Sequence, residues 1–353
     1  MARVLILGAG ISGHTAARYL GKWIGKKHQV IVASPNAKWN WIPSNIWVGV
    51  GEMTEQQVTF ELAPIYQKIN VEFHQARAIS IHPEGSAEHG KPFVTVEYTD
   101  AARAGQSATI EYDYLINATG PKLNFGATPG LGPEGYTTSV CTAAHALEAN
   151  AQLQKTIEAM KTGAQRTFVV GTGHGMCTCQ GAAFEYIYNV DHALREAGVR
   201  ERARLVWISN EYELGDFGMG GVHITRGGYL TNGKVFAESL MVERGMEWIT
   251  RAHVAKIEPG KIHYELLDGT FHELDFDFAM LIPPFAGVGL KAFDKAGADM
   301  TAELFAPNGF MKVDADYNPK PYEDWGKQDW PKTYQTPKYK TIFAIGIACA
   351  PPH

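Results

Sequence analysis

The stretch VLILGAGISG, residues 4–13, decides the fold of the first part of this chain. Its apolar run, residues 4–7, leads directly into Gly8, Gly10 and Gly13 and then into a stretch with helical character. In such a strand–loop–helix unit the first glycine permits a tight turn, the second lets a pyrophosphate approach the backbone, and the third lets the helix pack closely. The phosphates then lie at the helix N-terminus. The pattern predicts an adenine dinucleotide site and leaves NAD and FAD both open.

Length and composition indicate an ordinary globular protein of about two domains. The chain has 353 residues, of which 45% are hydrophobic and 20% charged, and its net charge is -5. No basic field is available for nucleic acid, so we expect no nucleic-acid partner. The longest apolar runs fall short of the roughly 20 residues that cross a bilayer, and the first strand leaves no room for a signal peptide. We therefore expect a protein that is soluble or at most attached to a membrane surface.

Four cysteines are too few and too scattered for a disulfide framework. They are Cys141, Cys177, Cys179 and Cys349. None has the paired spacing of a zinc site, and one residue separates Cys177 from Cys179 where a redox C-x-x-C motif has two. We expect no metal.

The remaining pattern is that of an α/β protein. A second strand, residues 28–33, ends at Ser34, where dinucleotide folds often place an acid on the ribose; a hydroxyl can still hydrogen-bond there. Residues 71–82 and 93–116 predict an antiparallel patch. A further strand, residues 167–170, precedes a second glycine-containing loop, GTGHGM. After this loop we expect a helix at 180–196, strands at 203–209 and 340–346, and an ordered loop at 317–339.

Three segments taken together resemble the flavoproteins with two dinucleotide-binding domains: GAGISG at 8–13, ATG at 118–120 and FAIG at 343–346. The resemblance implies two Rossmann-like domains, with a discontinuous FAD domain at 1–150 and 286–353 and the second domain, 151–285, inserted in it. It also implies FAD as the cofactor. The residues expected to contact FAD are Gly8, Gly10, Ile11, Ser12, Gly13, Ser34, Pro43, Ser44, Asn45, Ala118, Thr119, Gly120, Gly346 and Ile347.

Within that group the chain is similar to the sulfide:quinone oxidoreductases and to the related flavin subunit of flavocytochrome c sulfide dehydrogenase. Four segments carry the similarity: WIPSNIWVGVG at 41–51, VCTAAHA at 140–146, CQGAAFEY at 179–186 and AIGIA at 344–348. The similarity implies oxidation of sulfide to polysulfide or sulfur, with electrons passing to a quinone at a membrane surface, and a homo-oligomeric enzyme. By the same similarity, we expect the family's C-terminal quinone and membrane region to be absent from this chain, which ends at His353.

The same similarity assigns roles to particular side chains. Cys179, at the entry to a helix, is expected to be a redox cysteine, because a helix N-terminus lowers a thiol pKa and a thiolate is the reactive form. Cys141 corresponds to a cysteine near the flavin, and His145 would assist proton movement if it shared a helix face with Cys141. Glu185 matches an acid that helps with proton transfer. The family also has a histidine where this chain has Asp216, which leaves the proton route open.

The second sulfur that would pair with Cys179 stays open at this point. In other members it lies farther along than this chain extends, so Cys349 or Cys177 could take its place. Each of the cysteines could also be a buried, inert side chain, since free cysteine is often a core residue.

The second glycine-containing loop, GTGHGM, bears on which electron acceptor the protein uses. Met176 stands where a nicotinamide site would want a third glycine, which disfavours NAD(P)H, although Glu211 could imitate a ribose-binding acid. An apolar wall at Pro283, Pro284 and Phe285 would suit a quinone. The alternatives are a sulfide dehydrogenase subunit that reduces a cytochrome c, a type II NADH:quinone dehydrogenase, and a flavin-bound sulfur carrier or redox sensor without turnover.

Overall fold

The computed structural model describes residues 1–217, 220–321 and 324–352, and the chain divides into two compact units. Unit 1 comprises Met1–Trp39, Phe60–Lys122 and Ala286–His353, and unit 2 comprises Asn40–Thr59 and Leu123–Phe285. The packing division therefore differs from the expected boundary at residue 150, because residues 40–59 and 123–150 pack within unit 2.

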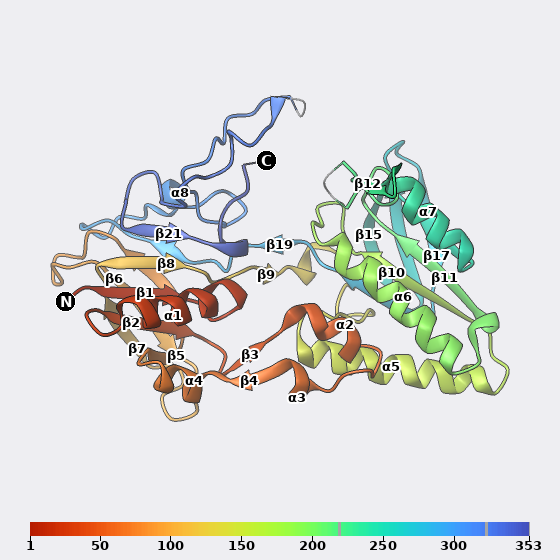
Figure 1. Cartoon of the computed structure of the whole chain (residues 1–353), viewed down its shortest axis with the longest axis horizontal. Helices are drawn as coiled ribbons and strands as arrows, with labels where there is room; N and C mark the ends of the chain where they lie inside the picture. The colour runs from red at the N-terminus through yellow and green to blue at the C-terminus, as the bar shows by residue number, and fades with distance from the viewer. Residues whose placement is uncertain (218–219, 322–323, 353) are drawn as a thin grey trace. The chain divides into compact units, whose positions relative to one another are not determined.

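Unit 1 is built on an eight-stranded sheet in the order β21-β8-β1-β2-β5-β6-β7, with β20 beside β5 (Figure 1). The strands β21, β8, β1, β2 and the start of β5 run parallel, whereas β5, β6 and β7 are antiparallel. Their bounds are β1 Arg3–Leu7, β2 Gln29–Ser34, β5 Glu72–His82, β6 Phe93–Tyr98, β7 Ser107–Glu111, β8 Tyr114–Asn117, β20 Lys291–Ala292 and β21 Ile342–Ala344. The blue C-terminal strand thus joins the red N-terminal strands in one sheet.

Both faces of this sheet are covered. Because side chains alternate along a strand, Ile6 faces a cluster that includes Ala17 and Tyr66, while Leu5 and Leu7 face the opposite cluster. The helices are α1 Ile11–Ile24, α4 Leu62–Lys68 and α8 Thr301–Leu304, and the last strand is followed by the short helix η5 Gly346–Ala348. A sheet buried on both faces is typical of parallel α/β folds.

Unit 2 contains a four-stranded parallel sheet in the order β14-β11-β10-β18 and a three-stranded antiparallel sheet, β15-β16-β17. The bounds of these strands are β10 Arg166–Thr172, β11 Ala203–Ile208, β14 Met246–Ile249, β15 Ala252–Glu258, β16 Lys261–Leu266, β17 Phe271–Asp275 and β18 Phe278–Ile282. Its longer helices are α5 Ala143–Lys161, α6 Gln180–Glu196 and α7 Gly233–Glu243. A separate hairpin joins β12 His223–Arg226 to β13 Tyr229–Asn232.

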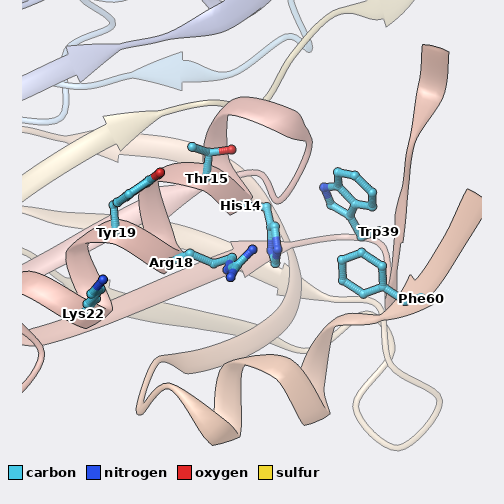
Figure 2. Close-up of a pocket in the computed structure, with 7 residues that line it drawn as sticks. All are labelled: His14, Thr15, Arg18, Tyr19, Lys22, Trp39 and Phe60. Atoms are coloured by element: carbon cyan, nitrogen blue, oxygen red, sulfur yellow. The ribbon is translucent and has the colours of Figure 1, made fainter.

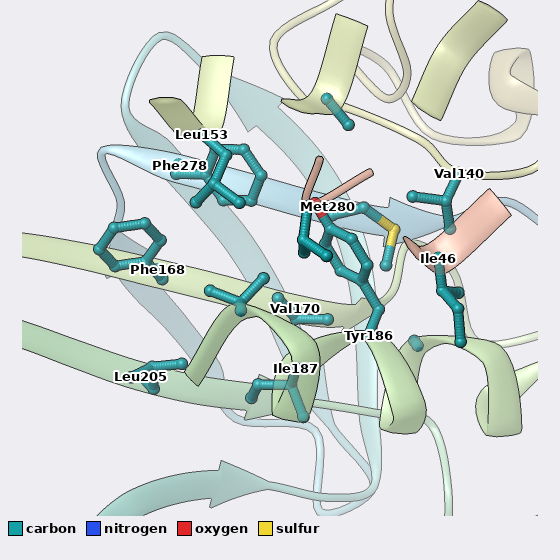
Figure 3. Close-up of a cluster of buried hydrophobic side chains, with 14 of the residues drawn as sticks. Ile46, Val140, Leu153, Phe168, Val170, Tyr186, Ile187, Leu205, Phe278 and Met280 are labelled. Carbon is teal, nitrogen blue, oxygen red and sulfur yellow. The ribbon is translucent and has the colours of Figure 1, made fainter. Parts of the chain in front are cut away.

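The core of unit 2 lies on the two faces of the parallel sheet. Phe168, Val170 and Met280 meet side chains of α5 and α6 on one face, as Figure 3 shows. Val169 and Leu281 point to the other face, where they meet the three-stranded sheet. At 25 cal/mol per Å², each large apolar side chain buried in this way contributes roughly 2 kcal/mol. Because both faces of this sheet are packed, the ends of β10 and β18 are held in place, and so is the second loop that follows β10.

Short elements complete the fold. They are β3 Lys38–Asn40, η1 Ile42–Ser44, α2 Asn45–Val48, α3 Glu55–Val58, β4 Thr59–Glu61, β9 Lys122–Leu123, η2 Phe125–Ala127, η3 Arg200–Arg202 and β19 Phe285–Ala286. In the part of the chain that the structure describes, no helix combines the length and apolar character needed to span a bilayer.

The structure confirms the mixed α/β fold, including the helix expected at 180–196. It corrects one detail of the expected antiparallel patch at 93–116. Residues 114–117 form β8, which pairs in parallel with β1 in the middle of the sheet, because the antiparallel order ends at β7.

Candidate functional site

The first glycine loop of unit 1 has a backbone that only glycine adopts without strain. Gly8 has φ +94°, and a Cβ atom there would lie 2.3 Å from the carbonyl oxygen of Ala118. A Cβ at Gly13 would lie 2.1 Å from the carbonyl oxygen of Gly8. Only glycine fits at these two positions, because Gly8 packs against the backbone of the ATG segment and Gly13 packs against the backbone of the loop itself.

Gly10 differs from its neighbours because its Cβ direction is open. It precedes α1 as the N-cap with φ -69° and ψ -165°, and an added Cβ would have no heavy atom of the described residues within 4 Å. The first N–H groups of a helix have no partner within the helix and carry its positive dipole end. An open, uncapped helix start beside a fixed turn fits the diphosphate of a dinucleotide, with the amides of Ile11 and Ser12 as donors.

The ATG segment and the last strand meet the same loop. The amide of Ala118 donates to Leu7 O at 2.8 Å, and the amide of Ile345 donates to Asn117 O at 2.9 Å. Gly346 has φ +62°, and a Cβ there would lie 2.4 Å from Ser12 Oγ. Three segments far apart in sequence therefore converge on the start of α1.

The other expected FAD contacts divide between the two units. Ser34 is buried at the end of β2, one strand from the glycine loop, since Ala33 pairs with Leu7. Thr119 donates its hydroxyl to Asn117 Oδ1 at 2.8 Å, Gly120 has open space where a Cβ would lie, and Ile347 is exposed. The remaining three, Pro43, Ser44 and Asn45, belong to η1 and α2 of unit 2, so their contact with FAD stays a prediction.

The second glycine-containing loop has a different geometry from the first. Helix α1 begins directly after Gly10, whereas α6 begins at Gln180, seven residues after Gly173. The intervening residues form turns, and Cys179 is the N-cap of α6. The helix start is therefore displaced from the glycines that would place a pyrophosphate on it.

Side chains already occupy the amides of this second loop. The amide of Gly175 donates to Nδ1 of His253 at 2.9 Å, and the amide of Met176 donates to Nδ1 of His174 at 3.0 Å. The Asn210 amide nitrogen donates to the carbonyls of Gly175 at 2.9 Å and Cys177 at 3.0 Å. A nucleotide diphosphate would have to displace these bonds, so the loop is not prepared to bind one.

Glu211 does not face a nucleotide either. Its carboxylate is 2% exposed and accepts hydrogen bonds from the amide of Phe217 at 2.7 Å and from Ser209 Oγ at 3.0 Å. Burial raises the pKa of this carboxyl to about 7, which the two hydrogen bonds oppose. The acid at the end of β11 therefore points into the protein and is not available as a ribose partner.

The environment of Cys179 differs from the expectation of an activated thiolate. The amide of Ala182 at the start of α6 lowers the pKa of the thiol, as a helix N-terminus should. Burial nevertheless outweighs this effect and raises the pKa above its ordinary value, and the nearby carboxylate of Glu185 raises it further. The resting side chain is therefore a thiol with a carboxylate close by.

Unit 2 gathers three of the four cysteines. The pKa of Cys141 rises to about 11 through burial, and the neighbouring Cys179 adds to this rise. Burial raises the pKa of Cys177 to about 12, with smaller contributions from Cys141 and Cys179. Cys177 also donates its S–H to Ile282 O at 3.0 Å, which stabilises the thiol form. All three are free thiols that lie close enough to influence one another electrostatically.

His145 and Cys141 do not share a helix face. Helix α5 begins at Ala143 after its N-cap Thr142, so Cys141 precedes the helix and the four-residue spacing has no helical meaning there. The ring of His145 lies edge-on to Phe125 at 5.8 Å, and burial lowers its pKa. Within the described residues its buried Nδ1 has no hydrogen-bond partner, so the neutral ring can still accept a proton.

Cys349 belongs to unit 1 and has separate surroundings. It follows η5, and its amide donates to Gly346 O at 3.2 Å, close to the FAD loop. Burial and the carboxylate of Asp314 raise its pKa to about 11. Its sulfur is therefore a half-buried thiol beside the late glycine of the cofactor site.

Sequence reasoning missed two residues that shape the second loop. His253, from β15, and Asn210, after β11, come from elements distant in sequence from Gly175, and no local motif marks either of them.

The apolar residues Pro283 and Pro284, which the sequence suggested as part of a quinone wall, are buried after β18. The carbonyl oxygen of Pro284 accepts a hydrogen bond from the amide of Asn124 at 3.0 Å.

Comparisons with known proteins agree with this geometry. The family of pyridine nucleotide-disulphide oxidoreductases matches residues 2–199. The sulfide-quinone reductase of Aquifex aeolicus is 30% identical over 349 residues, which cover 99% of this chain and 69% of that protein. The X-ray structure of the sulfide:quinone oxidoreductase from Aquifex aeolicus superposes with a TM-score of 0.76 at 29% identity, over 99% of this chain and 69% of that one.

More distant structures share the fold. NDH2 from Plasmodium falciparum has a TM-score of 0.68 at 16% identity, over 99% of this chain and 64% of that one. The NAD-dependent persulfide reductase from A. fulgidus has a TM-score of 0.61 at 17% identity, over 98% and 53%.

The glycine loop, the ATG segment and the late glycine strand, together with the matching family, define a flavoprotein oxidoreductase that binds FAD. Bound FAD supplies a two-electron acceptor. By its identity over nearly the whole chain, this protein belongs to the sulfide:quinone oxidoreductase family.

Proposed function

We propose that this protein oxidises sulfide to polysulfide or sulfur through a cysteine sulfur at Cys179 and passes the electrons to a membrane quinone. The observation that carries the proposal is the gathering of Cys141, Cys177 and Cys179 in unit 2, next to a loop whose amides are already occupied. The three cysteines supply the sulfur atoms for the reaction. The occupied amides disfavour a nicotinamide as the reaction partner at that loop.

The sulfur step needs an oxidised cysteine pair. HS⁻ attacks the Cys179 sulfur of a disulfide, a new S–S bond forms, and the old S–S bond breaks to release the partner as a thiolate. Oxidation of HS⁻ to zero-valent sulfur releases one proton and two electrons. Reduction of a quinone to a quinol takes up these two electrons, this proton and one further proton from solvent. Glu185, close enough to raise the pKa of Cys179, is placed to accept the proton.

The identity of the second sulfur is part of the proposal. Within unit 2, Cys141 and Cys177 are the neighbours of Cys179. The bond from Cys177 to Ile282 O favours its protonated form, which makes it a poor leaving thiolate. We therefore propose Cys141 as the more reactive neighbour and Cys177 as a structural thiol; Cys349 in unit 1 stays the alternative partner.

An anaerobic titration tests the proposal. The FAD-loaded protein is mixed with sulfide and then with a short-chain quinone while the flavin absorbance is followed. We expect sulfide to bleach the flavin and quinone to restore it. Bleaching by NADH but not by sulfide would refute the proposal in favour of an NADH dehydrogenase.

Matched cysteine variants locate the sulfur. Cys179→Ser should abolish bleaching by sulfide, whereas Cys177→Ser should retain it because a hydroxyl can still donate to Ile282 O. Flavin content and the unfolding midpoint show whether each variant is folded. Unchanged rates in Cys179→Ser would remove this residue from the mechanism.

The remaining partners are part of the same proposal. We propose attachment to a membrane surface, where the quinone is found, and assembly into a homo-oligomer. A cytochrome c that reoxidises the reduced protein faster than quinone would favour the cytochrome-linked alternative. Bleaching by sulfide with no reoxidation by either acceptor would favour the sulfur carrier or redox sensor.

A further inference from the structure

A pocket of about 500 Å³ lies along α1 in unit 1 and is lined on that helix by residues between His14 and Lys22. Figure 2 shows that it is lined on the helix side by His14, Arg18 and Lys22, which follow one another at intervals of four residues. Residues spaced by four lie on one face of a helix, so these three nitrogen-bearing side chains form one row. The proposed sulfur chemistry makes no use of this row.

The opposite wall of the pocket is aromatic and held in place. Trp39 and Phe60 stack with ring centroids 4.8 Å apart and an interplanar angle of 26°. Their neighbour His14 is 6% exposed, and its Nδ1 lies 3.1 Å from the hydroxyl of Tyr66. Burial lowers the pKa of His14, so the ring is neutral at neutral pH and its other nitrogen can donate or accept. The wall is therefore built by packing between α1, α4 and two short strands.

The pocket is lined by cationic side chains. Among the described residues that line it, none carries a carboxylate. Among the ion pairs of the described residues, none involves Arg18 or Lys22. A second hollow of about 370 Å³ shares His14, Arg18 and Phe60 and adds Lys68, which likewise has no carboxylate within ion-pair distance in the described chain. Two adjoining hollows thus present three cations.

The charge of the surrounding sequence agrees with this. Residues 1–39, the first segment of unit 1, contain six Lys and Arg residues and no Asp or Glu, although the whole chain carries a net charge of -5. The negative charge is therefore confined to the rest of the chain. A positive region of this kind attracts phosphate-bearing ligands and is screened by salt.

Exposed aromatic side chains flank the pocket along the same helix. Tyr19 is 52% exposed and Trp23 is 67% exposed, and their rings lie 5.1 Å apart. Large aromatic side chains are costly to leave in water, and Trp and Tyr beside Lys and Arg are typical of surfaces that meet lipid head groups. A small soluble phosphate would bind to the cations, but it would not need the exposed rings of Tyr19 and Trp23.

We propose that the α1 pocket binds a phosphate group, and that this group is the head-group phosphate of an anionic phospholipid. Arg18 and Lys22 contact the phosphate, Phe60 and Trp39 form the wall behind it, and Tyr19 and Trp23 enter the interfacial layer. This site rests on the membrane attachment that is part of the proposed function and names the surface that makes it. It is independent of the sulfur chemistry, which the flavin titration tests separately.

Vesicle sedimentation with the FAD-loaded protein tests this site. The vesicles consist of phosphatidylcholine alone or of phosphatidylcholine mixed with phosphatidylglycerol. We expect binding to the mixed vesicles only, and weaker binding as salt is raised. Because each cation near an anionic surface changes partitioning about fivefold, the double variant Arg18→Gln/Lys22→Gln should bind roughly 25-fold more weakly.

A charge-matched control separates a specific site from general attraction. Lys295 and Lys332 are exposed cations of unit 1 outside the pocket, so Lys295→Gln/Lys332→Gln removes the same charge elsewhere. This control should bind vesicles within about twofold of the parent chain, because its cations lie outside the proposed contact. Trp23→Ala should weaken binding without any change in charge. An equal loss in the control and the pocket variant would refute the site.

The source of the phosphate is tested separately. Inorganic phosphate and glycerol phosphate, each added at constant ionic strength, should leave vesicle binding in place. If either displaces the vesicles, the pocket takes a free phosphate and the lipid assignment is wrong. Bleaching of the flavin by sulfide should be unchanged in all of these variants, because none of these residues lies in the proposed sulfur or FAD sites.

Discussion

Replacing Gly10 by alanine separates the FAD site from the fold of unit 1. Gly10 has φ -69° and ψ -165°, a conformation that alanine adopts readily. In the part of the chain that the structure describes, its added Cβ would meet no heavy atom within 4 Å. The space it would enter is the open start of α1, where the diphosphate must approach the backbone. The substitution therefore leaves the protein's own contacts intact and places a methyl group where the ligand belongs.

The two expected effects differ in size. Alanine is a somewhat poorer N-cap than glycine but reduces the entropy of the unfolded chain, so the free energy of unfolding of the apoprotein should change by less than about 1 kcal/mol. An extra methyl group in a well-packed contact costs about 1–3 kcal/mol. At 1.4 kcal/mol per factor of ten, FAD affinity should fall by roughly 5-fold to 150-fold.

Gly8→Ala is the matched control. Gly8 has φ +94°, and its Cβ would lie 2.3 Å from the backbone carbonyl oxygen of Ala118, so this change should destabilise the apoprotein itself by more than about 2 kcal/mol. Urea unfolding of the apoproteins measures the first effect, and flavin absorbance after gel filtration at graded FAD concentrations measures the second. If Gly10→Ala binds FAD as tightly as the parent chain, the diphosphate does not lie at this helix start.

Three further predictions concern buried polar groups. The pKa of Glu211 is raised to about 7, above that of the unfolded carboxyl, so its stabilising contribution is complete below about pH 4.5 and is lost as the pH rises to about 7. Glu211→Gln should therefore remove about 3 kcal/mol of the pH dependence of the free energy of unfolding, measured in urea. An unchanged pH dependence in the variant would contradict this. Tyr186→Phe removes the hydroxyl that donates to Gly49 O at 2.9 Å and leaves a buried carbonyl unpaired, so thermal unfolding should show a loss of about 1–3 kcal/mol. Asp191 is fully buried and forms ion pairs with three arginines. Asp191→Asn should lower the free energy of unfolding, measured in urea, by about 2–4 kcal/mol. An unchanged free energy would mean that solvent satisfies these arginines.

Local patterns were enough to predict much of the fold, including the glycine turn at the start of α1. The run at residues 4–13 predicts β1, the turn and α1, because a turn with positive φ and a close helix leave only glycine at those positions. The helix at 180–196 is likewise given by its apolar spacing. Such features depend on neighbours in sequence and can be read without knowledge of distant contacts.

Properties that depend on distant contacts could not be predicted in this way. The amide of Gly175 is occupied by His253, which lies 78 residues away and belongs to another sheet. The pKa of Cys179 depends on how deeply packing buries it, and burial outweighs the local helix effect that the sequence suggested. Spacing alone also placed Cys141 and His145 on one helix face, although α5 begins only after Cys141.

The sequence by itself determined that this chain has a glycine loop of the dinucleotide type and four thiols, because backbone freedom and thiol chemistry belong to the residues themselves. Only the tertiary structure decided which loop keeps its amides open and which thiols become neighbours. The physical reason is that hydrogen-bond occupancy and desolvation are set by whatever packs against a group. The partner of the Gly175 amide, His253, comes from a distant part of the chain, and the core of unit 2 packs against Cys179.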